Sequence, residues 1–227
     1  MTAAHAYAEL LRFGRPVLTT ADAAIRLGLH VPAASKLLSR LARAGLVVPI
    51  RSGLWSTTRH VDPHTLPEYL TAPFPSYVSL LTALRLHGMI GQIPRRIFVA
   101  SLGPSRRIVT RSGEFSVHRL APEFFGGFKL RADGAIKLAT PEKALLDVLY
   151  LSRAKGGLFA RLPELELPTE FHMREARRWV DRIPGRSHRT MVARRLQETL
   201  ATATPRRRLR RRASTRTDDD DHAGRVS

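Results

Sequence analysis

The stretch that decides the N-terminal fold is residues 19–57, which read TTADAAIRLGLHVPAASKLLSRLARAGLVVPIRSGLWST. Two short helices are predicted in it, one over residues 21–27, ended by Gly28, and one over about residues 32–44, ended by Gly45. Glycine is the usual residue just beyond a helix end, because it adopts the left-handed conformation without a steric penalty. Two short helices joined by a tight connection form a helix-turn-helix.

The flanking sequence extends this motif on both sides. An Ala- and Leu-rich segment, residues 3–13, predicts a preceding helix that ends at Gly14. Behind the motif, residues 46–50 and 54–57 are strand-like and enclose an Arg-Ser-Gly turn at residues 51–53. Three helices followed directly by a hairpin with a basic tip are typical of a winged helix-turn-helix.

The third helix has one apolar and one basic face. The apolar side chains recur at three- and four-residue spacing: Ala34, Leu37, Leu38, Leu41 and Ala44. Off that stripe lie small polar or cationic side chains: Ser35, Lys36, Ser39, Arg40 and Arg43. Since the major groove admits an α-helix, we expect these five residues to bind DNA, together with Arg51 at the wing tip.

Composition favours the same kind of partner. The 227 residues include 38 Lys and Arg against 19 Asp and Glu, a net charge of +19, and are 43% hydrophobic. Such a charge favours nucleic acid first and an anionic membrane surface second. There is no cysteine, which excludes disulfides, thiol catalysis and cysteine-ligated metal. No apolar run approaches the roughly 20 residues of a membrane span, and the first residues do not resemble a secretory signal. We therefore expect a cytoplasmic protein without membrane contact.

The chain divides into four parts by composition. Residues 1–60 form the winged helix, and residues 61–75 have the composition of a linker, with four prolines: Pro63, Pro67, Pro73 and Pro75. Residues 76–204 form a second domain, and residues 205–227 a tail. Because Pro63 interrupts any helix that would align His60 with His64, we expect no metal site there.

The second domain is predicted to be α+β with a mainly antiparallel sheet. Apolar helices are expected over residues 77–87, capped by Ser76, and over residues 141–151, capped by Thr140. Between them lie strand-like segments at residues 96–101, 106–110, 114–120, 128–131 and 135–138. Two amphipathic helices, about residues 169–183 and 187–203, complete it.

Four segments of this domain resemble a known family. They are residues 76–84 (SYVSLLTAL), 97–100 (IFVA), 115–119 (FSVHR) and 138–147 (LATPEKALLD), the last being the most specific. Together with the winged helix, over about residues 5–200, the chain resembles the AbiEi-family antitoxins of bacterial type IV toxin–antitoxin systems.

The resemblance implies a function for each domain. The winged helix would repress its own operon by binding inverted repeats in the promoter, and the second domain would counteract a cognate nucleotidyltransferase-like toxin, with or without a stable complex. The residues that match the antitoxin-domain motif are Ser79, Thr140, Pro141, Glu142, Lys143 and Asp147. Taken alone, residues 140–142 also make a good helix cap. Lys143 and Asp147, four residues apart, also form an ordinary helical ion pair.

Two other functions stay open. One is a transcriptional regulator whose second domain senses a ligand, and an effector-dependent change in DNA affinity would identify it. The other is an enzyme, which turnover of a nucleotide would reveal. The sequence contains no phosphate-binding loop, dinucleotide fingerprint, nucleophile elbow or HExxH motif, so we expect no catalysis and no cofactor. His118 is expected to be a sheet-face histidine and not a catalytic base.

The tail combines opposite charges. Six of the seven residues from Arg206 to Arg212 are arginine, and residues 218–221 are aspartate. This composition predicts disorder and a sequence-independent, salt-sensitive affinity for nucleic acid. An extension without a function is the alternative.

Overall fold

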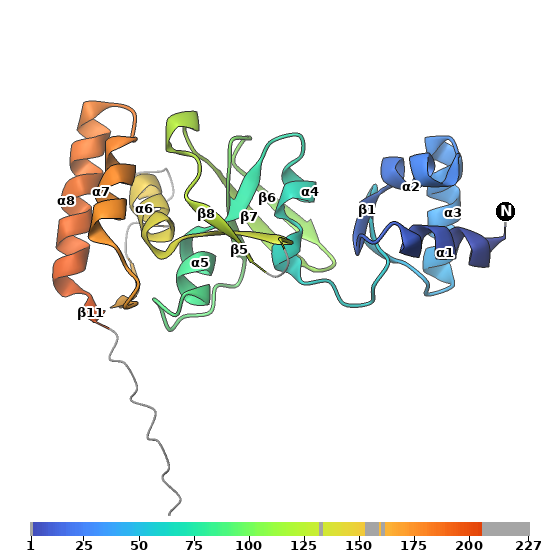
Figure 1. The fold of residues 1–227 in the computed structure, drawn as a ribbon, viewed down its shortest axis with the longest axis horizontal. Coiled ribbons are helices and arrows are strands. Elements are labelled where there is room, and N and C mark those ends of the chain that lie inside the picture. Colours follow the sequence, from blue (N-terminus) through green and yellow to red (C-terminus); the bar gives the residue numbers. More distant parts are fainter. Residues whose placement is uncertain (1, 132–133, 153–158, 160–161, 206–227) are drawn as a thin grey trace, which may run out of the picture.

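The computed structural model describes residues 2–131, 134–152, 159 and 162–205. Figure 1 shows a small lobe at one end, here called the winged helix (residues 3–58), and a larger body, here called the large lobe (residues 63–205). Both contain helices and a sheet, so the fold is α+β as predicted. The charged part of the tail, residues 206–227, lies outside the described residues.

The winged helix has the three predicted helices and the hairpin. Its elements are α1 (Ala3–Arg12), β1 (Val17–Thr19), α2 (Thr20–Leu27), α3 (Val31–Arg43), β2 (Val48–Arg51) and β3 (Leu54–Ser56). The short strand β1 was not predicted. It pairs with β3 and makes a three-stranded sheet in the order β1-β3-β2, which leaves β2 at an edge.

Local chemistry explains where the central helices begin and end. The backbone N–H of Asp22 donates to Oγ1 of Thr19 (3.0 Å), and the N–H of Thr19 donates to Oδ2 of Asp22 (2.8 Å). This reciprocal pair is a capping box, which satisfies two N–H groups that have no partner within the helix. Gly28 ends α2 in the left-handed conformation, with φ = 63°.

Both faces of the small sheet are covered. On one side Leu18 and Trp55 pack against the helices, and the indole N–H of Trp55 donates to Oγ1 of Thr20 at 2.9 Å. On the other side lies a second apolar cluster, here called the shared core. Its buried members come from both lobes: Val17, Ile50, Leu54, Leu66, Leu70, Val99, Ile108, Phe115 and Val117.

The proline-rich stretch between the lobes has a folded part. Residues 63–65 form a 3-10 turn, and Pro67–Thr71 form the short helix α4. Leu66 and Leu70 are buried in the shared core. These residues connect the lobes and also contribute to the contact between them.

The large lobe contains one six-stranded sheet. Its strands are β4 (Ser76–Val78), β5 (Ile97–Ser101), β6 (Arg106–Thr110), β7 (Gly113–Arg119), β8 (Phe128–Arg131) and β9 (Ile136–Ala139), in the order β6-β7-β5-β4-β9-β8. The pairs β6–β7, β4–β5 and β8–β9 are antiparallel, whereas β5–β7 and β4–β9 are parallel. The sheet is mixed, with antiparallel pairs in the majority.

One predicted helix begins in the wrong place. Residues 76–78 are the central strand β4, and the helix α5 runs only over Leu80–Leu86. A strand buried on both faces has a continuous apolar sequence, which periodicity cannot distinguish from a buried helix. Tyr77 and Val78 are both 0% exposed.

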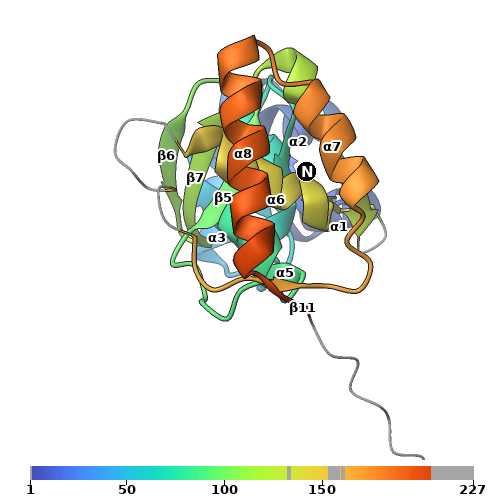
Figure 2. The same cartoon turned by 90° about the vertical axis from the view of Figure 1, so that its left-hand side faces the viewer.

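The remaining helices build layers outside the sheet. α6 (Pro141–Leu151) has the predicted bounds, and α7 (Met173–Asp181) and α8 (Arg186–Thr202) lie close to theirs. Figure 2 shows α7 and α8 side by side in front of α6, and both contact it. Every residue from Glu142 to Leu149 is buried, so α6 forms the centre of this lobe. A two-residue strand pair, β10 (Glu166–Leu167) with β11 (Thr204–Pro205), joins the start and end of this helical part.

Candidate nucleic-acid interface and the buried motif

The predicted DNA-reading helix presents its cations to solvent. Lys36, Arg40 and Arg43 are exposed on α3, and Ser35 and Ser39 are half-buried beside them. Of the predicted stripe on the opposite face, Ala34, Leu37, Leu38 and Leu41 are buried, whereas Ala44 is exposed because α3 already ends at Arg43. Among the residues that the structure describes, none forms a hydrogen bond or ion pair with the side chains of Lys36, Arg40 or Arg43. These three charges are therefore available to an external anion.

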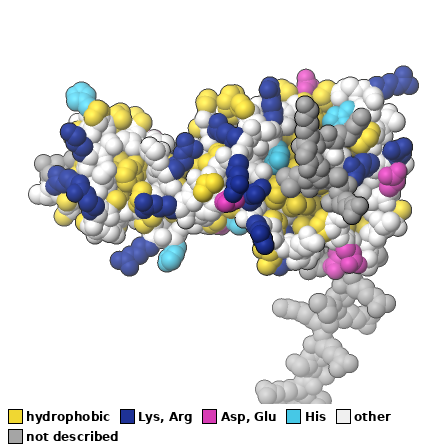
Figure 3. All heavy atoms as spheres, turned by 180° about the vertical axis from the view of Figure 1, so that it is seen from behind, with side chains coloured by type: hydrophobic (Ala, Val, Ile, Leu, Met, Phe, Trp, Pro, Cys, Tyr) yellow, Lys and Arg dark blue, Asp and Glu magenta, His cyan; other side chains and the backbone are white. Residues whose placement is uncertain are grey.

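The two acidic side chains of the winged helix have partners outside α3. Residues 1–60 contain only Glu9 and Asp22. Glu9 pairs with Arg12 and Arg26, and Asp22 caps α2. Neither carboxylate neutralises α3. Figure 3 shows Lys and Arg side chains on this lobe and on the adjoining part of the large lobe.

The wing places one more cation at its tip. Arg51 is exposed at the end of β2, and the turn that follows uses Gly53 at φ = 77°, a conformation that favours glycine. The pairing of β2 with β3 passes from Pro49↔Trp55 to Arg51↔Leu54, so Ile50 is the extra residue of a bulge. The wing tip is thus basic and open to solvent.

Residues 5–58 match a family model described as "Transcriptional regulator, AbiEi antitoxin". The winged helix matches the AbiEi regulators. The matched range begins within α1 and ends two residues after β3, so it spans nearly all of the winged helix. For the proteins of that family, the description as transcriptional regulators implies DNA binding. The DNA contacts of individual residues remain predictions. A search of curated proteins returned no match.

None of the helices that the structure describes is both long enough and apolar enough to cross a bilayer.

The residues of the predicted antitoxin motif meet in the interior of the large lobe. Lys143 and Asp147 form an ion pair on α6 in which both side chains are 0% exposed. The hydroxyl of Ser79 donates to Oδ2 of Asp147 at 2.6 Å. Tyr77 accepts from Nζ of Lys143 (2.9 Å) and donates to Oδ2 of Asp147 (3.1 Å). This network joins the central strand β4 to α6.

Aromatic rings enclose the ammonium group of Lys143. Its Nζ lies 3.8 Å from the ring centre of Phe124 and 5.2 Å from that of Trp179, within the range of cation–π attraction. Burial lowers the pKa of Lys143 and raises the pKa of Asp147, and each shift is opposed by the partner's charge. The network is closed to solvent, so its residues stabilise the lobe and do not form an exposed surface.

The other motif residues organise the ends of helices. Oγ1 of Thr140 accepts from the N–H of Lys143 at 3.3 Å and caps α6. The buried carboxylate of Glu142 accepts from the N–H of His172 at 2.7 Å, just before α7. Pro141 occupies the first position of α6, where a missing N–H is tolerated. Residues 140–142 therefore connect the start of α6 to the start of α7.

Sequence patterns did not identify the aromatic partners of Lys143. Tyr77, Phe124 and Trp179 come from three segments far apart in the chain. Their positions around one ammonium group depend on the packing of the whole lobe, and no local motif signals it.

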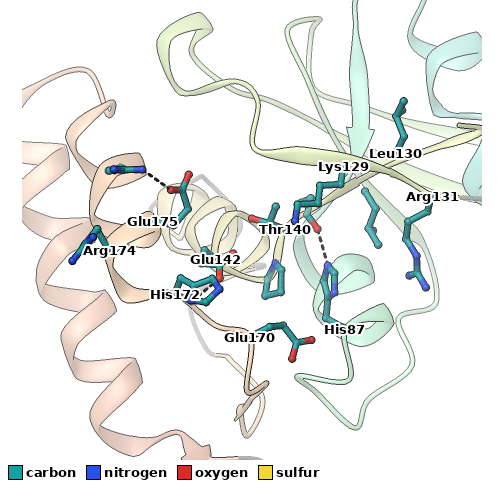
Figure 4. Close-up of a pocket in the computed structure, with 14 residues that line it drawn as sticks. His87, Lys129, Leu130, Arg131, Thr140, Glu142, Glu170, His172, Arg174 and Glu175 are labelled. Carbon is teal, nitrogen blue, oxygen red and sulfur yellow. Dashed lines mark hydrogen bonds and ion pairs between the residues drawn. The ribbon is translucent and has the colours of Figure 1, made fainter.

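A cavity of about 780 Å³ opens beside the start of α6 (Figure 4). Its lining includes Lys129 and Arg131 from β8, the cap residue Thr140, Glu142 from α6, and Arg174 from α7. Acidic and basic groups are both present, so it suits a polar ligand of mixed charge. At its edge, Nε2 of His87 is 2.7 Å from the carbonyl oxygen of Ala139.

His118 lies on the sheet, as the sequence indicated. It stacks on Phe98, with ring centres 5.9 Å apart, and its Nε2 is 2.9 Å from Oγ of Ser116. Burial lowers the pKa of His118 to about 4. The imidazole is therefore neutral near pH 7 and part of the packing.

Proposed function

We propose that this protein is an autoregulating antitoxin. Its winged helix binds operator DNA, inverted repeats in the promoter of its own operon, through Ser35, Lys36, Ser39, Arg40 and Arg43 on α3 and through Arg51 on the wing. Its second domain counteracts a nucleotidyltransferase-like toxin encoded beside it. No catalytic step is assigned to either lobe.

The observation that supports DNA binding most directly is the unpaired basic face of α3. Three exposed cations stand there without an acidic neighbour on the same helix. A surface of this kind attracts phosphates and fits the width of the major groove. The match of residues 5–58 to AbiEi regulators points the same way.

The support for antitoxicity is the sequence of the large lobe. Residues 76–84 and 138–147 resemble the AbiEi antitoxin domain, and they contain β4, most of α5, the end of β9 and most of α6. Their polar residues build the network around Lys143, which is closed to solvent. A toxin would therefore contact the outer surface of the lobe, which this network stabilises.

The DNA-binding test is a gel-shift titration of duplex DNA from upstream of the gene. Simultaneous replacement Lys36→Ala and Arg40→Ala should abolish the specific shift, since each good base contact is worth about 1–3 kcal/mol. The matched control is Arg177→Ala with Arg186→Ala, which removes the same charge from exposed positions on α7 and α8, far from the winged helix (Figure 1). Wild-type binding by the first variant would refute the assignment of α3.

The antitoxin test is co-expression with the nucleotidyltransferase-like protein of a neighbouring gene. The full chain should restore growth that the toxin arrests. The α3 variant should restore it too if the toxin is supplied from an unrelated promoter, because neutralisation is assigned to the large lobe. Continued arrest with the folded full chain would contradict the antitoxin assignment.

The cavity beside α6 favours a second candidate, a regulator whose large lobe senses a ligand. Its volume and mixed lining suit a small polar molecule. Thermal unfolding of the protein against a panel of polar metabolites tests it: a ligand that raises the midpoint and also changes operator affinity would support this function over antitoxicity.

A further inference from the structure

The tripeptide Arg-Ser-Gly occurs at two turns of this protein. Residues 51–53 run from the last residue of β2 through the tip of the wing, and residues 111–113 run from the turn after β6 to the first residue of β7. In both turns the glycine has a positive φ, 77° at Gly53 and 137° at Gly113. The two turns belong to different lobes and are separated by about sixty residues of sequence.

The fold brings the two turns together. The backbone N–H of Arg111 donates a hydrogen bond to the carbonyl oxygen of Ile50 at 3.2 Å. Ile50 is the bulged residue of the edge strand β2 and directly precedes Arg51. The backbone of one basic turn is therefore attached to the residue beside the other.

The shared core holds this contact in place. Ile50 and Leu54, on either side of the wing tip, are buried against Ile108 and Phe115, on either side of the Arg111 turn. Ile50 is 1% exposed and Phe115 is 0% exposed. Because apolar side chains flank both turns and pack on each other, the two tips keep a fixed spacing.

The side chains at both tips remain available. Arg51 and Arg111 are exposed, and within the described part of the chain no hydrogen bond or ion pair engages either guanidinium. Arg107, on β6, is 55% exposed although it pairs with Glu114. Both guanidinium groups are therefore available to bind an external anion.

We propose that the β6–β7 hairpin acts as a second wing, whose Arg111 contacts a DNA phosphate next to the one met by Arg51. This inference rests on the proposed DNA binding of the winged helix and extends it to the large lobe. Phosphates of one strand follow each other every 3.4 Å along the duplex axis. Two neighbouring turns can therefore meet successive phosphates of the same backbone. Such contacts position the protein and carry no sequence information.

The test is a salt titration of binding to two duplexes of equal length, one from the promoter and one of random sequence. Each neutralised phosphate contributes about 0.9 to the slope of log affinity against log salt concentration. Arg111→Ala should lower that slope by about 0.9 on both duplexes and leave the ratio of the two affinities unchanged. Arg111→Lys should restore the slope.

Arg119→Ala is the matched control, because Arg119 is also exposed and lies at the other end of β7. It should leave the slope unchanged. Arg111→Ala keeps the backbone N–H that donates to Ile50. An unaltered unfolding midpoint would show that the contact between the two turns is intact. A wild-type slope for Arg111→Ala would overturn the second wing.

A further pair of variants separates this inference from the proposed function. If Arg51→Ala flattens the slope and Arg111→Ala does not, the hairpin proposal fails and DNA binding by the winged helix stands. If the Lys36 and Arg40 replacements also leave promoter binding intact, the proposed function fails as well.

Discussion

Lys143 and Asp147 stand one turn apart on α6 and form an ion pair from which solvent is excluded. An exposed pair at this spacing contributes only about 0.2–0.5 kcal/mol. Here each charge depends on the other, because a buried charge without a partner strongly lowers the free energy of unfolding. The pairing expected from the spacing is present, and its burial changes its energetic weight.

We expect Lys143→Met to lower the free energy of unfolding by about 3–5 kcal/mol, since it leaves Asp147 buried without its partner. Adding Asp147→Leu should recover part of that loss. Urea unfolding of the two single variants and the double variant measures the coupling. Strictly additive losses would contradict the interdependence of the pair.

The capping box of α2 gives a second prediction. Thr19→Ala removes the acceptor of the Asp22 N–H and should lower the free energy of unfolding by about 0.5–2 kcal/mol. Thr19→Ser keeps a hydroxyl and serves as the control, with a smaller loss. Equal losses for both would show that the methyl group matters and the cap does not.

The pH dependence of stability should contain a contribution from His118. Its pKa in the folded state is about 4, below the usual 6.5, so the unfolded chain binds a proton more readily between these values. Stability is therefore lost as the pH falls from about 6.5 to 4, at up to about 1.4 kcal/mol per pH unit. In His118→Phe, the decline in this window should be shallower. Parallel pH profiles of the two proteins would count against the burial of His118.

The shared core makes the winged helix depend on the large lobe. A fragment of residues 1–62 should bind promoter DNA more weakly and unfold at a lower urea concentration than the same lobe in the full chain, because Val17, Ile50 and Leu54 lose their cover. Trp55 fluorescence reports on this lobe, and Trp179→Phe removes the other tryptophan from the full chain. Equal midpoints would mean that the contact between the lobes adds no stability.

The arginine-rich tail remains a sequence-based prediction. Deleting residues 205–227 should weaken binding to promoter and random DNA alike and flatten the salt dependence, with the ratio of the two affinities preserved. Antitoxicity should persist, since the family resemblance ends near residue 200. Salt titration of both proteins on both duplexes is the measurement. Identical slopes would favour an extension without a DNA contact.

The sequence predicted the elements that have strong local signals. Capping residues and glycine ends predicted α2 and α3, and the Thr140–Pro141 pair predicted the start of α6. Ser76–Val78 was assigned to a helix, because a strand buried on both faces lacks alternation. β1 was missed because three residues are too few for a period to be recognised.

The candidate interface was predictable only where it lies on one continuous segment. The basic face of α3 follows from helical spacing. The proximity of Arg111 to the wing depends on the bulge at Ile50 and on apolar contacts between distant strands, which no local pattern encodes. The repeated Arg-Ser-Gly tripeptide was the one available signal, and it identifies two turns without placing them together.

The shared core also bears on how such a protein can be inherited. Exchange of a winged helix between related proteins would succeed only where the incoming domain presents apolar side chains at the places of Val17, Ile50 and Leu54. A recombinant without these apolar side chains would expose Leu66 and Phe115 to solvent. The turns that carry Arg51 and Arg111 would then no longer be held together. The winged helix and the large lobe should therefore be inherited together, and chimaeras should need Val17, Ile50 and Leu54 transplanted along with α3.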